Sequence, residues 1–564
     1  MQPSSGSDPS FEARAEAASD DPDSLAATVA TDPPGTPGRP AGVGETRQQL
    51  RGSSLLLVGR LLSVGVNLVT QVLIARYLSV SDFGAFGFAL SVVALVGGLL
   101  GLGFERAIPR FLPIYDERDD RPRFFGTLAL VLGVILGMGA MITLLIIGFQ
   151  GALIGRVAPD AFTVTVVALM IALAPIEALD TVLTDLFAVF RSARAIFLRK
   201  YILAPGLRLL VVTLLIATAS GVEFLAVGYV LTGLLGIALY ATMLPGLLRR
   251  VGLVGERHRE DAPGEAARGE DASADARGGR RRRIVIPFRE IVSYTVPLLT
   301  MDLVLLSMSS IDTIIVGNIH GTEAVAELRV VDSTAKLNAL VFTTFSILFV
   351  PAAARFFARG DRDSMRDLYW RHAAWIAVLS FPIFALTFSL AEPVTVLLFE
   401  ERYRSSGIIL AILSLARYID AAFGANGQTI RVFGGVKEIV VINIVTAGAN
   451  LVLALLLIPP FSALGAAVAI LLSYIVYNIL KQIALRRVTG IPMFDMTYAP
   501  VYGAIVVGAV VIGALEITVD PPLIVELALA GIGSLAVVSF GRRVLHIADT
   551  FPELLRFPGG RFLR

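Results

Sequence analysis

The sequence predicts an all-α integral membrane protein with 14 transmembrane helices: two pseudo-symmetric six-helix bundles around a central cavity, plus two C-terminal helices. Three observations predict this fold: an apolar composition, an alternation of charge between successive loops, and an internal repeat. Apolar residues make up 55% of the 564 residues and charged residues 17%, whereas soluble proteins are about 45–50% apolar and about 25% charged. The composition therefore argues against a soluble multidomain enzyme.

The composition also narrows the chemistry. The chain has no cysteine and only four histidines, which lie far apart in the sequence. Disulfides, thiolate nucleophiles, Cys-ligated zinc and iron–sulfur clusters are excluded, and no His-based metal site is expected. No Gly-rich loop of the kind that cradles phosphates is found, so direct ATP hydrolysis is not expected. We expect no cofactor, no nucleic-acid partner and no enzymatic activity.

The first element is a polar N-terminal tail. Residues 1–47 are rich in Ser, Pro, Asp and Glu and contain no apolar stretch. This composition predicts a disordered cytoplasmic tail. The segment lacks the basic region and apolar core of a signal peptide.

Apolar stretches long enough to span a bilayer begin at Ser53, at roughly 20 residues per crossing. They predict helices near 53–76, 84–104, 124–149, 162–190, 197–219, 224–244, 291–317, 328–353, 372–391, 406–428, 438–458, 462–480, 498–515 and 523–541. The predicted domains are an N-terminal lobe (48–244), a polar cytoplasmic linker (245–290), a C-terminal lobe (291–485), helices 13 and 14 (486–545) and a cytoplasmic tail (546–564).

Loop charges test this topology, because Lys and Arg gather in cytoplasmic loops. Alternate loops are rich in Arg and Lys, as in Arg118, Arg121 and Arg123, and in Arg280 to Arg283, whereas the opposite loops hold only Arg156, Arg402 and Arg404. The alternation predicts a multi-pass protein of the cytoplasmic membrane with both termini in the cytoplasm.

The internal repeat connects the two lobes. The run from Val189 to Ile196 matches the run from Val432 to Ile439 at an offset of 243 residues. Helices 1 to 6 thus recur as helices 7 to 12, and because each copy holds an even number of helices, both have the same orientation in the membrane. Two such bundles facing each other across a cavity are typical of transporters.

Several segments resemble the multidrug, oligosaccharidyl-lipid and polysaccharide exporter superfamily, specifically its 14-helix polysaccharide transporter branch. The resembling segments are ARYLSVSDFGAFGFALS (75–91), GLGFERAIPRF (101–111), VGNIHGTEAVAEL (316–328), LFVPAAARFFARGD (348–361) and NLVLALLLIPPFSALGAAVA (450–469). The resemblance implies a flippase that moves a polyprenyl- or dolichyl-linked oligosaccharide across the membrane by alternating access. Its partners would be that glycan lipid, membrane lipids and a coupling proton or sodium ion.

Polar side chains at membrane depth are costly and usually face a cavity or a partner. In the first predicted helix, three such residues share one face at spacings of seven and four, and the seventh helix has a corresponding stripe that includes two aspartates. We expect the two stripes to face each other across the substrate cavity. With further cations suited to a diphosphate, the predicted cavity residues are Arg60, Asn67, Gln71, Arg208, Asp302, Asp312, Lys336 and Arg417.

Four carboxylates in the predicted helices are candidates for ion coupling. Glu177 and Asp420 coincide at the repeat offset, and Asp332 lies one turn before Lys336. The candidates are Glu177, Asp180, Asp332 and Asp420. For Asp332 with Lys336, and for Arg417 with Asp420, simple mutual neutralisation is the competing interpretation.

The sequence leaves other functions open. A cation-coupled multidrug antiporter and a murein-precursor lipid flippase fit the same superfamily. A membrane glycan polymerase or ligase is disfavoured because the predicted outer loops are short and lack paired carboxylates with a histidine.

Overall fold

The structure is a computed structural model. It describes residues 43–101, 103–190, 193–250, 285–295, 299, 310–519 and 522–545. Most of the predicted N-terminal tail, most of the predicted linker, the predicted cavity residue Asp302 and the predicted C-terminal tail lie outside the described residues. Every element of the described chain is helical.

The N-terminal half, residues 43–250, begins with α2 (Val43–Tyr77) and α3 (Val80–Gly101). It continues with α4 (Ala107–Glu117), α5 (Arg121–Gly148), α6 (Gln150–Leu153), α7 (Ala161–Met170), α8 (Leu173–Val189), α9 (Ala193–Ile196), η2 (Phe197–Leu203), α10 (Ala204–Ala217) and α11 (Val222–Arg250). Asp120 and Asp160 cap α5 and α7, since each carboxylate accepts a hydrogen bond from a backbone amide three residues on.

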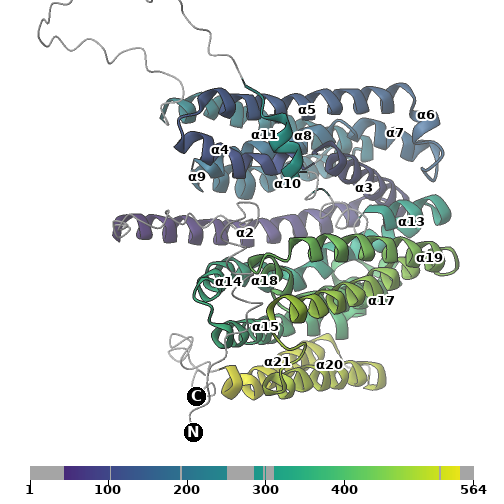
Figure 1. The fold of residues 1–564 in the computed structure, drawn as a ribbon. Coiled ribbons are helices and arrows are strands. Elements are labelled where there is room, and N and C mark those ends of the chain that lie inside the picture. Colours follow the sequence, from purple (N-terminus) through teal and green to yellow (C-terminus); the bar gives the residue numbers. More distant parts are fainter. Residues whose placement is uncertain are drawn as a thin grey trace, which may run out of the picture.

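The C-terminal half, residues 285–545, includes α13 (Asp312–Ala335), η4 (Lys336–Ala339), α14 (Leu340–Ala358), α15 (Arg362–Phe384), η5 (Ala385–Ser389), α16 (Ala391–Phe399) and η6 (Glu401–Tyr403). It ends with α17 (Ser406–Ala422), α18 (Asn426–Val432), α19 (Val436–Thr489), η7 (Met496–Tyr498), α20 (Ala499–Val519) and α21 (Leu523–Leu545). In Figure 1, α3 to α11 lie on one side of α2 and α14 to α21 lie on the other, with α13 beyond one end of α2.

Two of these helices fold back on themselves. In α13 the break is Gly321, whose φ of 87° lies in the region that favours glycine. In α19 it is Ser462, with a φ of 54°. A methyl group on Gly465 would lie 2.1 Å from the carbonyl oxygen of Leu457, which is possible only where the chain reverses. Each helix therefore consists of two segments joined where the chain reverses.

The break at Gly321 corrects one predicted boundary. The eighth helix was expected to begin at residue 328, but helical structure resumes directly after Gly321. Glu323, Glu327 and Arg329 lower the hydropathy of this stretch, and the predicted start at residue 328 leaves both glutamates outside the helix and Arg329 at its edge. Arg329 consequently lies well inside the helix rather than at its start.

Eleven described helices are long and apolar enough to cross a membrane, or twelve if the bent pair Asp312–Ser346 and Phe349–Ala358 is one span. This confirms an all-helical, multi-pass membrane protein. The count of 14, the two six-helix bundles and the domain boundaries stay predictions, since residues 296–298 and 300–309 of the predicted seventh helix lie outside the described residues.

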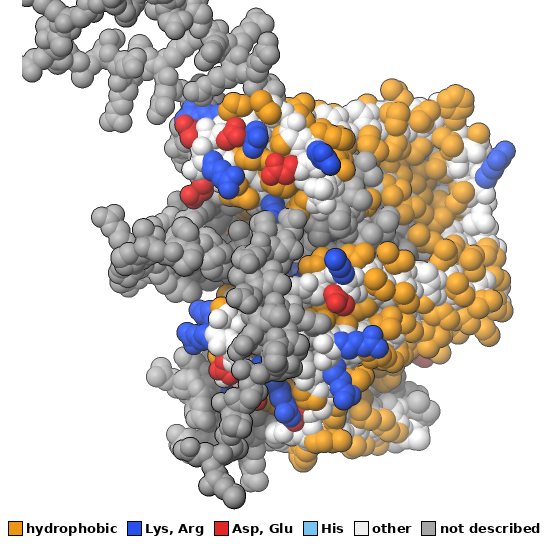
Figure 2. Space-filling view, in the orientation of Figure 1, with side chains coloured by type: hydrophobic (Ala, Val, Ile, Leu, Met, Phe, Trp, Pro, Cys, Tyr) orange, Lys and Arg blue, Asp and Glu red, His pale blue; other side chains and the backbone are white. Residues whose placement is uncertain are grey.

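The surface agrees with a membrane setting. Hydrophobic side chains cover most of the right-hand part of the face shown in Figure 2, and most of the charged side chains lie toward the left and centre. Exposed apolar residues include Leu144, Leu456, Val510 and Ile524. The largest internal core is shared by the two halves, with α3 packed against α13.

Gly84 in α3 allows that packing. A methyl group at this position would lie 1.8 Å from the backbone oxygen of Thr322 in α13. We expect Gly84→Ala to lower the free energy of unfolding by about 1–3 kcal/mol, because the two helix backbones must separate. Gly133→Ala in α5 is the matched control, since nothing lies within 4 Å of the added atom there. Thermal unfolding of both variants in detergent measures the difference, and equal stability would contradict the prediction.

Candidate substrate cavity

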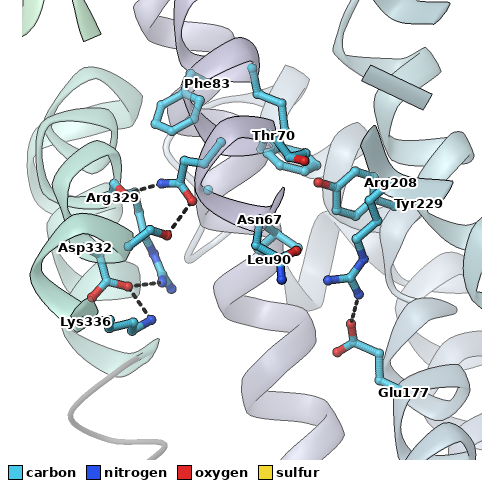
Figure 3. Close-up of a pocket in the computed structure, with 15 residues that line it drawn as sticks. Asn67, Thr70, Phe83, Leu90, Glu177, Arg208, Tyr229, Arg329, Asp332 and Lys336 are labelled. Atoms are coloured by element: carbon cyan, nitrogen blue, oxygen red, sulfur yellow. Dashed lines mark hydrogen bonds and ion pairs between the residues drawn. The ribbon is translucent and has the colours of Figure 1, made fainter. Parts of the chain in front are cut away.

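A cavity of about 300 Å³ lies between the two halves. Helices α2, α3, α8, α10 and α11 contribute to it from the N-terminal half, and α13 and η4 from the C-terminal half. Figure 3 shows the side chains of its walls. The lining residues are Asn67, Thr70, Gln71, Ile74, Phe83, Phe86, Gly87, Leu90, Glu177, Arg208, Tyr229, Arg329, Asp332, Ser333 and Lys336.

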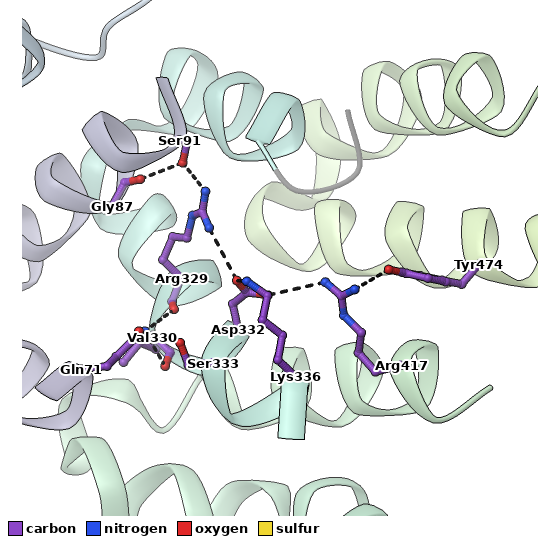
Figure 4. A network of polar contacts seen from close by, with 10 residues as sticks. All are labelled: Gln71, Gly87, Ser91, Arg329, Val330, Asp332, Ser333, Lys336, Arg417 and Tyr474. Atoms are coloured by element: carbon purple, nitrogen blue, oxygen red, sulfur yellow. Dashed lines mark hydrogen bonds and ion pairs between the residues drawn. The ribbon is translucent and has the colours of Figure 1, made fainter. Parts of the chain in front are cut away.

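The wall formed by α13 and η4 is positively charged. Lys336 Nζ lies 2.6 Å from the carboxylate of Asp332, and Arg329 Nη1 lies 3.5 Å from it. The spacings of three and four residues put these groups on one helix face. Arg417 from α17 approaches the same carboxylate at 3.9 Å. Three cations thus share one anion, which leaves an excess of two positive charges (Figure 4).

Two of these cations, Arg329 and Arg417, also donate a hydrogen bond to a hydroxyl group on a neighbouring helix. The Arg329 guanidinium also donates to the Ser91 hydroxyl of α3, and its side chain packs against Gly87, where a methyl group would lie 3.1 Å from the Arg329 stem. Arg417 donates to the Tyr474 hydroxyl and lies 5.1 Å from the centre of that ring. Lys336 is the most exposed of the three cations, with a side-chain exposure of 48%.

The opposite wall has a second charged pair. Arg208 of α10 donates to Glu177 of α8 at 3.1 Å, and its guanidinium lies 5.3 Å from the centre of the Tyr229 ring (Figure 3). These two side chains remain 37% and 46% exposed. The pair therefore faces the cavity from the N-terminal half, where its polar atoms can contact a solute.

Gln71 joins the two halves beside the cavity. Its amide nitrogen donates to the Arg329 carbonyl at 2.9 Å, and its amide oxygen accepts from the Ser333 hydroxyl at 2.6 Å. Gln71 contacts the second segment of α13, the predicted eighth helix, beyond the break at Gly321. That the stripe on the first helix faces the seventh stays a prediction, since residues 300–309 lie outside the described residues.

Of the 12 predicted site residues, the cavity is lined by Asn67, Gln71, Glu177, Arg208, Asp332 and Lys336. Arg417 contacts this wall from behind. The other described residues lie elsewhere: Arg60 is half-buried on α2, Asp312 is buried and accepts from Asn450 at 3.3 Å, Asp180 pairs with Arg199 at 2.6 Å, and Asp420 pairs with Lys481 at 3.5 Å.

Several cavity residues are not among the predicted ones, notably Arg329, Ser333 and Tyr229. Arg329 has a clear signal, because it lies three residues before Asp332, but it was placed at the edge of a helix that was started too late. Tyr229 carries no signal, since one Tyr in an apolar helix is ordinary. Its role depends on Arg208, which only the packing of α10 against α11 brings near.

Two protein-family models match this chain. The family model described as "Polysaccharide biosynthesis protein" matches residues 49–357, and a second, "MatE", matches residues 297–456. A sequence search of curated proteins found no match.

Solved structures with a similar fold are flippases and transporters. "Lipid II flippase MurJ, inward closed conformation" has a TM-score of 0.63 at 12% identity over 88% of this chain and 99% of that chain. An inward-facing multidrug resistance MATE family transporter of the MOP superfamily has a TM-score of 0.55 at 15% identity, over 76% and 95% of the two chains. A MOP superfamily transporter from Pyrococcus furiosus has a TM-score of 0.52 at 17% identity, over 79% and 96%.

At these identities the structures establish the fold alone, and the sequence match establishes the family. The first family model covers more than half of the 564 residues. The chain therefore belongs to the polysaccharide biosynthesis protein family, within the multidrug, oligosaccharidyl-lipid and polysaccharide (MOP) exporter superfamily.

Proposed function

We propose that this membrane transporter is a flippase that moves a lipid-linked oligosaccharide, on a polyprenyl or dolichyl phosphate or diphosphate, across the cytoplasmic membrane by alternating access. The glycan would serve a cell-surface polysaccharide or a glycoprotein. The observation that supports this proposal is the positive wall of the cavity, where Arg329, Lys336 and Arg417 surround Asp332.

The charge of this wall fits a phosphorylated headgroup. Guanidinium groups present planar sets of donors that match phosphate oxygens, and ammonium groups add a mobile charge. Lys336 is exposed to the cavity and can turn from Asp332 toward an incoming phosphate. Arg208 on the facing wall lets both halves contact the same headgroup. The polar side chains of Asn67, Gln71 and Ser333 would contact the sugars.

The lipid tail needs an apolar path beside the polar one. A groove of about 610 Å³ runs between α20 and α21, and its described lining includes Val507, Val511, Leu529, Ile532 and Phe540. Because its walls are apolar, we assign the hydrocarbon tail of the carrier to this groove. The headgroup would then cross the membrane inside the protein while the tail stays in or near the bilayer.

The coupling ion would act on the acidic candidates. Each of them has a cationic partner in this structure: Arg208 for Glu177, Arg199 for Asp180, Lys336 for Asp332 and Lys481 for Asp420. A proton or sodium ion would therefore have to replace an existing ion pair. Glu177 is the best placed for this, since its pair is exposed to the cavity.

A multidrug antiporter is the second candidate, favoured by the MatE match over residues 297–456. A murein-precursor flippase is the third, and its fold relative is the lipid II flippase. Deleting the gene in its host and analysing the lipid-linked glycans separates the three. Accumulation of a completed glycan lipid on the cytoplasmic face supports the proposal. An unchanged glycan profile with altered drug resistance favours the antiporter, and accumulation of a murein precursor favours the third.

Lys336→Ala provides the residue-level test. In the deletion strain, we expect this variant to export glycan on the order of tenfold more slowly than the wild type at equal protein abundance, because a charge-assisted hydrogen bond to phosphate is lost. Lys437→Ala, at an exposed position at the start of α19, is the matched control and should export normally. Normal export by Lys336→Ala would contradict the assignment of the cavity.

A further inference from the structure

Two helix ends from opposite halves of the molecule meet near the cavity. α2 ends at Tyr77 and α16 ends at Phe399. The last carbonyl groups of a helix have no partner within it, and the helix dipole gives this end a partial negative charge. Such ends attract cationic donors.

Arg76, on the last turn of α2, donates to the end of α16. Its Nε lies 2.8 Å from the Leu398 carbonyl oxygen, and its Nη2 lies 2.5 Å from that of Leu397. The donor belongs to the N-terminal half and both acceptors belong to the C-terminal half.

Arg402, in η6 just after α16, donates in the opposite direction. Its Nη2 lies 2.7 Å from the carbonyl oxygens of both Ala75 and Arg76, and its Nη1 lies 3.0 Å from that of Leu78. Each arginine thus caps the helix end at or beside which the other lies. We call these five hydrogen bonds the reciprocal cap.

The chain after α16 is shaped to deliver Arg402. Glu400 has a φ of 73°, a conformation that favours glycine, and this turn sends η6 back toward α2. The guanidinium of Arg402 lies 5.4 Å from the centre of the Tyr403 ring, and that ring packs edge-on against Phe83 of α3 at 6.2 Å. The strained turn and the buried tyrosine hold Arg402 in place.

The reciprocal cap lies next to one end of the cavity. Ile74 and Phe83 line the cavity, and they neighbour the capped carbonyls of α2 and the packed Tyr403 ring. Two more contacts between the halves involve the loops of this end: the Asn318 amide donates to the carbonyls of Arg156 and Val157 at 3.1 Å, and the hydroxyls of Ser81 and Thr322 lie 2.8 Å apart. In the topology predicted from loop charges, this end faces outward.

We propose that the reciprocal cap of Arg76 and Arg402 is the latch that keeps the outer end of the cavity closed, and that it opens to release cargo; this rests on the alternating access of the proposed function. The chemistry suits a latch, because the acceptors in the opposite half are all carbonyl groups, and the one carboxylate paired with Arg402, that of Glu400 at 3.4 Å, lies in its own half. When the halves part, water can replace each partner at this exposed end, and no opposite charge is left unpaired by the opening.

The absence of cysteine from the chain makes the latch directly testable. Ser333→Cys places a single thiol in the cavity, and a membrane-impermeant maleimide added to the outer side of intact cells reports access to it. Adding Arg76→Ala and Arg402→Ala together should raise the rate of labelling about tenfold or more, since five hydrogen bonds that hold the closed state are removed. A labelling rate equal to that of the parent overturns the proposal, as does a rise seen only with reagent on the cytoplasmic side.

Arg404→Ala is the matched control. This arginine is two residues from Arg402 and also exposed, but its partners Glu392 and Glu401 lie in its own half. Its removal should leave labelling unchanged, and a rise equal to that of the double variant overturns the proposal. Arg402→Lys keeps the charge but loses the fork that reaches three carbonyls, so its rate should fall between the two; if the double variant does not fold, this variant carries the test.

A crosslink gives an independent measurement. Ser81→Cys with Thr322→Cys places two thiols across the same end, where the native hydroxyls touch. Oxidative crosslinking should be efficient in the parent and reduced by the double arginine substitution; an undiminished yield overturns the proposal. Neither the labelling measurement nor the crosslinking measurement requires a substrate. If labelling rises while gene deletion leaves the glycan profile unchanged, the latch stands and the proposed function fails.

Discussion

Asp332→Ala is expected to abolish glycan export and to lower the free energy of unfolding by about 3–5 kcal/mol, the usual cost of removing one member of a buried charge group. Asp332 is the carboxylate that Lys336, Arg329 and Arg417 share, and its side chain is only 19% exposed. Without it, three cations would repel one another in a cavity wall of low dielectric constant.

The effect should depend on charge rather than on the lost side chain alone. Asp332→Asn keeps the volume but not the charge, and we expect it to fail nearly as badly. Removing a cation together with the anion, as in Asp332→Ala with Lys336→Ala, should recover part of the stability without recovering export. Thermal unfolding in detergent and export at matched abundance measure the two effects separately.

Asp363→Ala is the control for loss of an acidic residue, since Asp363 is exposed on the first turn of α15. It should behave as the wild type in both measurements. An Asp332→Ala protein that is as stable as this control would show that the three cations do not depend on the shared carboxylate.

Arg199→Ala is expected to have the second largest effect, a loss of about 3–5 kcal/mol of stability. Arg199 lies 2.6 Å from Asp180 with side-chain exposures of 5% and 28%, and its guanidinium lies 5.7 Å from the centre of the Tyr240 ring. Gly236 leaves the space for it, since a methyl group there would lie 1.7 Å from the guanidinium. Truncating Arg199 would leave Asp180 without its closest cation and would open an empty space where the arginine side chain had been.

Arg208→Ala is the matched comparison, because its pair with Glu177 joins the same region, η2–α10, to α8. That pair is exposed to the cavity, and exposed pairs contribute about 0–1 kcal/mol. We expect Arg208→Ala to unfold at nearly the wild-type temperature but to export slowly, whereas Arg199→Ala should be poorly stable. If the two variants lose the same stability, the distinction between a structural pair and a cavity pair is wrong.

The fold class follows from the sequence because bilayer physics leaves few choices. Apolar length and loop charge indicate spans and their order, and the family match over residues 49–357 includes the quoted segments 75–91, 101–111 and 316–328. The ends of helices are harder to predict from the sequence where charged side chains lie inside the protein. The stretch from Glu323 to Arg329 is polar enough to predict a loop by hydropathy, yet it continues the helix. Arg329 lines the cavity and donates to Ser91 of α3, Glu327 accepts from Ser405, and Glu323 stays exposed.

The site was predictable only as a set of candidates. Helical spacing placed Asp332 with Lys336, and both line the cavity. Spacing gives no information about partners from distant helices, so it could not show that Asp180 meets Arg199 inside the N-terminal half or that Asp312 meets Asn450. These contacts depend on how the helices pack.

The contacts between the halves follow a common rule, because their acceptors are mainly backbone oxygens. Gln71, Arg76, Asn318 and Arg402 all donate across the seam to main-chain carbonyls. A carbonyl is present whatever the side chain, so Leu397, Leu398 and Val157 could be exchanged without loss of the acceptor. This region could therefore drift in sequence while the halves still recognise each other, provided that a few donors are kept. Because only the donor side chains must be kept, these contacts offer a physical reason why two proteins can share this fold at only 12% sequence identity.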